Sequence, residues 1–223
     1  MQGANGSTTY TDLSTNAHAM TASGNAAITT STFMVGDSSC AFDGTQDHIT
    51  VGANNVFDWM HKGTEAWTMV FRCRATVIDG TNYRTVWSNF IGGAQNGIIV
   101  FHQPNGNLGL VIGNGNASFA VSHSAGNNTL VLNQWHYVEI NYDPTAAHGS
   151  RTMIFVDGQT KGSQGGGTNT YASGAANYSQ PRIGRYPSTY DFSWIGQLQE
   201  MVIYRGVACH RANYSPPAVQ FNL

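Results

Sequence analysis

Turn-forming residues interrupt this chain so often that a long amphipathic helix has no room to form. Glycine occupies 26 of the 223 positions, and Asn, Ser and Thr break almost every window before a three-turn apolar stripe develops. The apolar residues gather instead in short runs bounded by turn residues, which is typical of β-strands. The sequence therefore predicts an all-β fold.

About a dozen short strands separated by turns suit a two-sheet antiparallel jelly-roll sandwich. Asn-Gly at 105–106 and 114–115 and Asp-Gly at 157–158 each follow an apolar run, which predicts hairpins there. The Gly-rich segment 162–180 is expected to be a long surface loop that carries an edge strand. The other expected strands cover residues 26–31, 48–51, 66–75, 84–90, 97–102, 108–112, 117–122, 134–142, 151–156, 180–185 and 196–204.

One domain over residues 1–223 is expected, because 41% hydrophobic content fills one core and two domains would be cramped. Only 10% of the residues are charged and the net charge is −2, so we expect no nucleic-acid partner. No apolar run reaches the roughly 18 residues of a membrane span, and the opening residues lack signal-peptide features. We therefore expect a soluble protein, synthesised without export and without a membrane partner.

Alternation along two strands indicates which side chains are buried. Trp67, Met69, Phe71 and Cys73 share one face of their strand and are expected in the core, with Cys73 as a small buried hydrophobe. The three cysteines show no C-x-x-C spacing, so neither a disulfide framework nor a zinc site is expected. Between Leu198 and Met201 the alternation fails, which predicts a β-bulge.

Residues 40–51, CAFDGTQDHITV, are similar to the opening signature of laminin G-like domains of the concanavalin A-like lectin and glucanase superfamily. Further blocks follow in family order at 66–71, 133–140 running on to 154–158, and 183–184 with 194–204. The resemblance covers roughly residues 8–220. It implies a jelly roll of two curved antiparallel sheets whose termini lie close together.

Residues 204–208 and 212–217 resemble the end of laminin G-like domains in tailed-bacteriophage virion proteins. This resemblance implies a virion-surface location, with a major capsid or tail protein as partner. We favour head decoration over a tail adhesin, and we expect a homo-oligomer, with a trimer favoured. Surface glycans of the host are a further expected partner. A free carbohydrate-binding, lectin-like module is the alternative, and a glycoside hydrolase is a third.

The sequence predicts a protein that is not an enzyme. Glucanases of the superfamily carry closely spaced carboxylates on one strand, whereas Glu65, Glu139 and Glu200 lie far apart in this chain. No Ser stands in a G-x-S-x-G elbow, and the eight histidines show no zinc-ligand spacing. No catalytic residue is therefore assigned.

Calcium is the one cofactor that deserves consideration, because several relatives implied by the resemblance use it. Asp43 and Asp47 are the candidate ligands. A calcium ion takes six to eight oxygen ligands, and no loop concentrates carboxylates. The favoured interpretation is that both aspartates cap turns, in a rigid corner where Phe42 anchors a strand end and Gly44 permits a positive φ.

Sugar recognition without catalysis remains open, since aromatic faces stack on sugar rings and amide side chains bond hydroxyls. The alternative is that these aromatic residues pack loops on the sandwich or line a subunit contact. Within the Gly-rich loop, Tyr171 is expected at the surface. The candidate aromatic residues near predicted turns are Trp59, Tyr83, Tyr171, Tyr178, Tyr186 and Tyr190.

Overall fold

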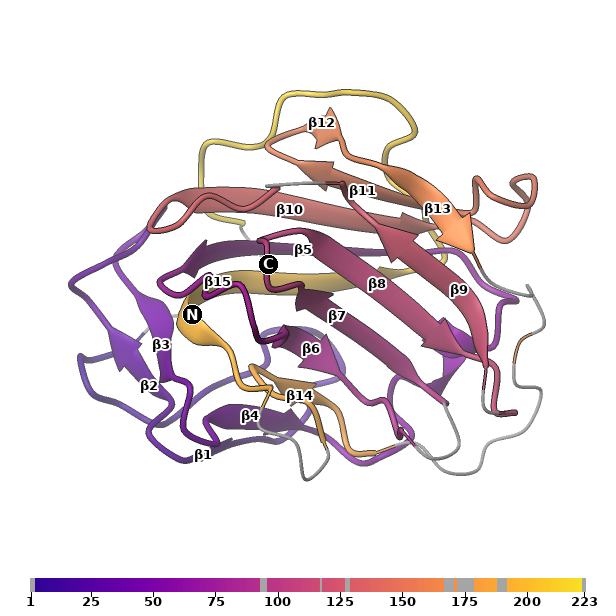
Figure 1. Ribbon diagram of the computed structural model, residues 1–223. Coiled ribbons are helices and arrows are strands. Elements are labelled where there is room, and N and C mark those ends of the chain that lie inside the picture. The colour runs from indigo at the N-terminus through magenta and orange to yellow at the C-terminus, as the bar shows by residue number, and fades with distance from the viewer. Residues whose placement is uncertain are drawn as a thin grey trace.

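The computed structural model describes residues 3–92, 96–116, 118–126, 129–166, 171, 179–187 and 192–221. Within these residues the chain forms two antiparallel sheets packed face to face, as Figure 1 shows. One 3-10 helical turn, η1 (Asp58–His61), is the only helix of the described part. The predicted all-β jelly-roll sandwich is confirmed.

The first sheet contains eight of the described strands, and β13 and β1 form its edges. In spatial order its strands are β1 (Met20–Ser23), β4 (His48–Val51), β14 (Arg182–Ile183), β6 (Arg84–Ser88), β7 (Ile98–His102), β8 (Leu108–Gly113), β9 (Phe119–Ser124) and β13 (Ser163–Gly166).

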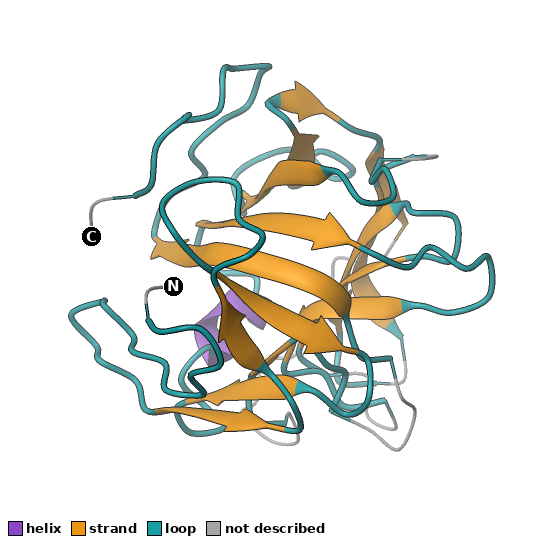
Figure 2. Ribbon diagram, turned by 90° about the vertical axis from the view of Figure 1, so that its left-hand side faces the viewer, coloured by secondary structure: helices purple, strands orange, loops and turns teal. Residues whose placement is uncertain are grey.

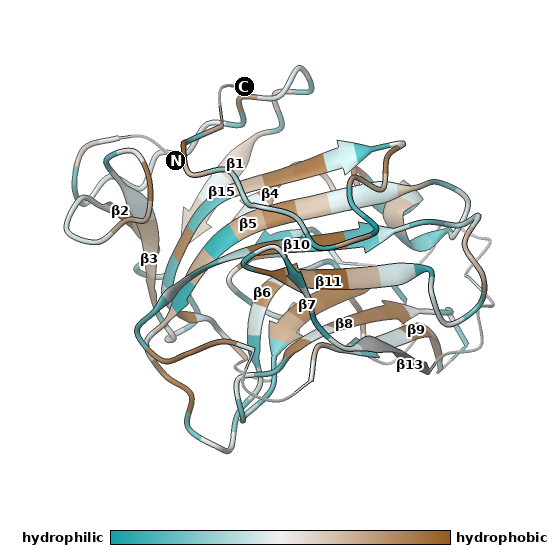
Figure 3. Ribbon diagram, turned by 90° about the horizontal axis from the view of Figure 1, so that it is seen from above, coloured by the Kyte–Doolittle hydropathy of each residue, from teal (hydrophilic) through white to brown (hydrophobic). Residues whose placement is uncertain are grey.

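The second sheet contains seven of the described strands, with β5 at its centre. In spatial order its strands are β12 (Gln159–Thr160), β11 (Thr152–Val156), β10 (Trp135–Tyr142), β5 (Trp67–Ala75), β15 (Ile195–Arg205), β3 (Ser39–Asp43) and β2 (Ala27–Thr29). Figure 3 shows hydrophobic segments, in brown, that alternate with white and teal segments along the strands.

The core lies between the sheets and follows the alternation of the central strands. Trp67, Met69, Phe71 and Cys73 of β5 are completely buried in it, as the sequence predicts. Met69 pairs with Ile140 of β10, so apolar side chains stack side by side on the inner face. Burial of such side chains is the main favourable term in the folding of the sandwich.

Every strand expected from the sequence has a counterpart, and the edge strand expected within 162–180 is β13. Three strands are missed: β1, β3 and β12. Their short sequences, MTAS, SCAFD and QT, carry too few β-branched or alternating apolar residues to signal a strand. Their positions are fixed by pairing: β1 pairs with β4 and β3 with β15, both remote in sequence, and β12 pairs with β11 across a tight turn.

The turn predictions are confirmed at all three positions. The segments 103–107 and 114–118 join β7 to β8 and β8 to β9, and Asp157-Gly158 joins β11 to β12. Asp157 has a φ of 53° and Gly158 a φ of 73°, as a type I′ hairpin turn requires.

The bulge predicted in β15 is also present, because the pairing of β15 with β5 shifts register between Gln199 and Val202. Glu200 adopts a φ of 51° at this point. Leu198 remains in the core, whereas the carboxylate of Glu200 forms a buried ion pair with Arg72. The extra residue thus leaves Leu198 in the core and directs Glu200 to Arg72.

Residues 207–221, hereafter the C-terminal strap, cover the outer face of the seven-stranded sheet. In Figure 1 this segment, in yellow, passes beside β10, β11 and β12. The Arg72 guanidinium donates to the carbonyl oxygens of Pro217 (2.7 Å) and Val219 (3.2 Å). The amide of Phe221 donates to Glu200 (2.9 Å). The buried ion pair of the sheet therefore anchors the strap through backbone groups.

Figures 2 and 3 place the segments that lead to the two termini on the same side of the molecule, as the jelly-roll topology implies. No helix among the described residues is long or apolar enough to cross a membrane.

Tyr171 is partly buried, so the prediction of an exposed side chain is wrong. Its ring meets Tyr142 edge-on with centroids 5.8 Å apart, and it packs against the core. A Cβ at Gly63 would lie 2.4 Å from the Tyr171 ring, so the ring fills space that only glycine leaves open. Tyr171 is therefore part of the packing of the sandwich.

Trp67→Ala should lower the free energy of unfolding by about 3–5 kcal/mol, because it empties a completely buried site. Tyr171→Ala removes a partly buried ring and should cost about 1–3 kcal/mol. Urea denaturation of both variants measures these losses. A Tyr171→Ala loss below about 0.5 kcal/mol would show that the ring does not pack as described.

Stability should fall with acidification, because burial holds the pKa of both His61 and His123 at about 4. In the unfolded chain these rings titrate near pH 6.5, so between about pH 6.5 and 4 the unfolded state binds more protons. The stabilisation is complete above pH 6.5, and up to about 3 kcal/mol per histidine is lost as the pH falls to 4.

Urea denaturation at pH 7 and pH 5 tests this expectation. His123→Gln should reduce the difference between the two pH values, whereas the same change at the exposed His148 should leave it unaltered. Equal effects of the two substitutions would contradict the assignment of the pH dependence to buried rings.

Candidate functional site

The outer face of the eight-stranded sheet carries apolar side chains where a solvated sheet would carry polar ones. On β7, Ile98 and Val100 point into the core, so Ile99 and Phe101 point outward. Phe101 pairs with Gly109 of β8, and a Cβ at Gly109 would lie 2.6 Å from the Phe101 ring. The ring therefore lies flat over a position that has no side chain.

Phe101 belongs to a chain of ring contacts across this face, which we call the aromatic ridge. The rings pair as Phe101–Tyr83 (5.5 Å between centroids), Tyr83–Phe192 (6.1 Å), Phe192–Tyr186 (6.0 Å), Tyr186–Phe90 (6.1 Å) and Phe90–Phe119 (6.3 Å). Tilted and edge-on arrangements at these separations are favourable for aromatic pairs. The six residues thus support one another in fixed orientations.

Exposure differs along the aromatic ridge. Phe90 and Tyr186 are buried, with 5% and 8% of their surface accessible, whereas Tyr83 is 44% exposed. Phe101, Phe119 and Phe192 are partly buried. Buried rings therefore form a base beneath rings that offer surface to a ligand, and a contiguous apolar patch of this kind is typical of an interaction site.

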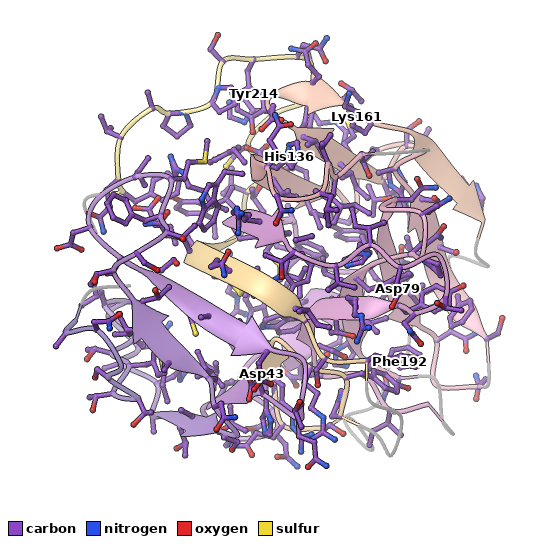
Figure 4. All side chains as sticks on the ribbon, turned by 60° about the vertical axis from the view of Figure 1, so that its left-hand side comes forward. Asp43, Asp79, His136, Lys161, Phe192 and Tyr214 are labelled. Carbon is purple, nitrogen blue, oxygen red and sulfur yellow. The ribbon has the colours of Figure 1, made fainter. Side chains whose placement is uncertain are left out.

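A rigid polar turn borders the aromatic ridge beside Tyr83. Asp79 accepts hydrogen bonds from the amides of Thr81 (3.0 Å) and Asn82 (2.9 Å) and pairs with Arg84 (3.0 Å). Hydrogen bonds from the Asn82 side chain and these amides hold the pKa of Asp79 well below its usual value. Figure 4 shows Asp79 and Phe192 near each other and well apart from Tyr214. Hydrogen-bonding groups therefore flank the rings.

The structure brings two of the six candidate aromatic residues together, since Tyr83 and Tyr186 both belong to the aromatic ridge. Trp59 lies elsewhere, with its Nε1 donating to the carbonyl of Val56 (3.2 Å) and the Arg205 guanidinium 5.0 Å from its ring centroid. Tyr171 packs beside Tyr142. Tyr178 and Tyr190 fall outside the described residues.

Four members of the aromatic ridge were not predicted as site residues: Phe90, Phe101, Phe119 and Phe192. The available signal was in β7, IIVFH, where both alternating faces are apolar. A strand of this kind in an antiparallel sheet has an apolar outer face.

Asp43 and Asp47 occupy the corner expected from the sequence. Asp47 accepts the amides of Asn25 (2.5 Å) and Asp43 (2.6 Å), and Asp43 accepts the amide of Thr45 (2.7 Å). Burial raises the pKa of Asp47, while the Asn25 side chain lowers that of Asp43. Both carboxylates thus cap turns. Within the described chain, no group of three or more His, Cys, Asp or Glu residues is arranged to hold a metal ion.

All three glutamates hold structural contacts. Glu65 forms a two-pronged ion pair with Arg205, and Glu200 pairs with Arg72. Glu139 accepts hydrogen bonds from His210, Tyr214 and Asn141. Glu139 and Glu200 thus help to fasten the C-terminal strap.

Comparison with known families and structures identifies the fold. Residues 43–209 match a laminin G-like family described as the concanavalin A-like lectin/glucanases superfamily. The chain belongs to this superfamily. The resemblance to laminin G-like, concanavalin A-like domains is thereby confirmed. No curated protein sequence matches the chain significantly.

Two solved structures with a similar fold are domains named for binding. The binding domain of botulinum neurotoxin serotype D aligns with a TM-score of 0.59 and 15% identity, over 90% of this chain and 45% of that one. The CBM40 of the Ruminococcus gnavus IT-sialidase, bound to α2,3-sialyllactose, aligns with a TM-score of 0.51 and 12% identity over 66% and 78%.

A Bacteroides ovatus protein aligns over 66% of this chain with 18% identity and a TM-score of 0.47. The present chain spans 38% of the length of that protein. At such identities the likeness shows the fold alone.

Proposed function

We propose that the chain is a non-catalytic module that binds a glycan on the aromatic ridge. The observation that carries this proposal is the row of six contacting rings on the outer face of the eight-stranded sheet. The C–H faces of sugar rings stack on aromatic side chains, and flanking polar groups orient the hydroxyls. The turn around Asp79 supplies such groups beside Tyr83.

The fold supports this proposal, because the same scaffold carries the sialyllactose-bound CBM40 of Ruminococcus gnavus. A glycosidase, by comparison, needs two carboxylates that flank a glycosidic bond, one of them protonated. The three glutamates of this chain are instead engaged by Arg205, Arg72 and the C-terminal strap. Binding without hydrolysis is the function that these contacts favour.

A glycan array, followed by titration calorimetry with the best ligand, tests the binding site. Tyr83→Ala should weaken binding about three- to ten-fold, as expected for one lost ring contact, with little change in melting temperature because Tyr83 is 44% exposed. The matched control is Phe33→Ala, which removes an equally exposed ring outside the aromatic ridge. Equal loss in both variants, or a bound glycan that is cleaved over time, would contradict the proposal.

We further propose that the module lies on the surface of a tailed-bacteriophage virion, with head decoration favoured over a tail adhesin. The support is the resemblance of residues 204–208 and 212–217 to such virion proteins and the sparsely charged composition. A homotrimer fits attachment to a symmetric lattice.

Mass spectrometry of purified particles should detect the chain, and sedimentation should give a closed oligomer at micromolar concentration. A glycan-binding monomer that is absent from particles would favour the alternative, a free lectin-like module.

A further inference from the structure

A cavity lies on the seven-stranded sheet, between its outer face and the C-terminal strap. Its volume is about 310 Å³, at the lower end of the range for small-ligand pockets. The strap side includes Cys209, Tyr214 and Phe221, and the sheet side includes Tyr137, Glu139 and Tyr204. The rings of three tyrosines, one phenylalanine and His210, together with one carboxylate, therefore line this space, which we call the strap cavity.

Glu139 is 1% exposed and held in one position. Its oxygens accept hydrogen bonds from Asn141 Nδ2 (2.7 Å), the Tyr214 hydroxyl (2.8 Å) and His210 Nδ1 (2.9 Å to each oxygen). These donors fix the carboxylate and occupy its lone pairs. A ligand ammonium with N–H groups would have to displace them, whereas a ligand attracted by charge alone would not.

Two of the aromatic residues already contact a cation of the protein itself. The Arg72 guanidinium carbon lies 5.2 Å from the centroid of Tyr137 and 5.6 Å from that of Phe221. The Tyr137 ring meets Tyr214 edge-on, with centroids 6.4 Å apart. The charge of Arg72 is balanced by Glu200, so it leaves the charge of Glu139 available to the cavity.

The negative charge of Glu139 shifts the pKa values of the tyrosines that line the cavity. Burial, and then the negative charge of Glu139, raise the pKa of Tyr137 to about 12. Burial and the same carboxylate also raise the pKa of Tyr214 and, together with Cys209, that of Tyr204. The tyrosines therefore stay neutral. His210, bonded to Glu139, is 41% exposed at its side chain and lies at the solvent side.

We propose that the strap cavity binds a small organic cation without N–H groups, of the quaternary ammonium class. Such a cation needs aromatic faces and a nearby negative charge rather than hydrogen-bond acceptors. The strap cavity is lined by the rings of Tyr137, Tyr204, Tyr214 and Phe221 and by the fixed carboxylate of Glu139. The His210 ring stacks on one face of Tyr214, with centroids 3.7 Å apart. This site is separate from the aromatic ridge and does not depend on glycan binding.

Titration of the full chain with choline, compared with its neutral isostere 3,3-dimethylbutan-1-ol, tests the charge requirement. Choline should bind at least about ten-fold more tightly, the size of a cation–π contact in a desolvated site. Glu139→Gln keeps the shape of the side chain and should abolish this preference. Equal binding of the two probes, or binding of neither, would overturn the proposal.

Because Glu139→Gln also touches the strap, Tyr204→Leu provides a second variant that removes one aromatic wall without touching the carboxylate. It should weaken choline binding several-fold while the melting temperature stays near that of the parent chain, and Tyr83→Ala on the aromatic ridge should leave choline binding unchanged.

Cys209 is exposed and lines the strap cavity, whereas Cys40 and Cys73 are buried. Choline should therefore slow alkylation of Cys209 by iodoacetamide, and an unchanged rate at saturating choline would place the ligand elsewhere.

Discussion

Burial of both faces of β5 is the constraint on which the rest of the structure depends. On the inner face, Trp67 and Phe71 meet the core shared by the two sheets. On the outer face, Arg72 is completely buried although it is charged, and Glu200 and the strap carbonyls bind its two terminal nitrogens. A buried charge is tolerated only with such partners. The position of the C-terminal strap follows from this requirement.

Sequence periodicity predicted what depends on local pattern: the inward side chains of β5, the Asp157-Gly158 turn and the bulge in β15. It could not predict the burial of Arg72, since the partner Glu200 stands 128 positions away. The burial of Tyr171 was missed for the same reason. The space that its ring fills exists because Gly63, remote in sequence, has no side chain.

The candidate site shows the same division. Tyr83 and Tyr186 were singled out because aromatic residues near turns commonly meet ligands, and the fold brings both to the aromatic ridge. Phe101 was not predicted as a site residue, because β7 is apolar on both alternating faces. Periodicity alone does not say which of these faces packs in the core. The burial of Ile98 and Val100 in the core of the folded sandwich places the Phe101 ring on the outside, over Gly109 of β8.

The attachment of the C-terminal strap also determines how the fold carries mechanical load. Tension along residues 217–221 is transmitted through the Pro217 and Val219 carbonyls to Arg72, and from there into the middle strand of a seven-stranded sheet. Hydrogen bonds to neighbours on both sides, β10 and β15, resist displacement of that strand. Force along the strap therefore reaches two neighbouring central strands, β5 through Arg72 and β15 through the bond from Phe221 to Glu200.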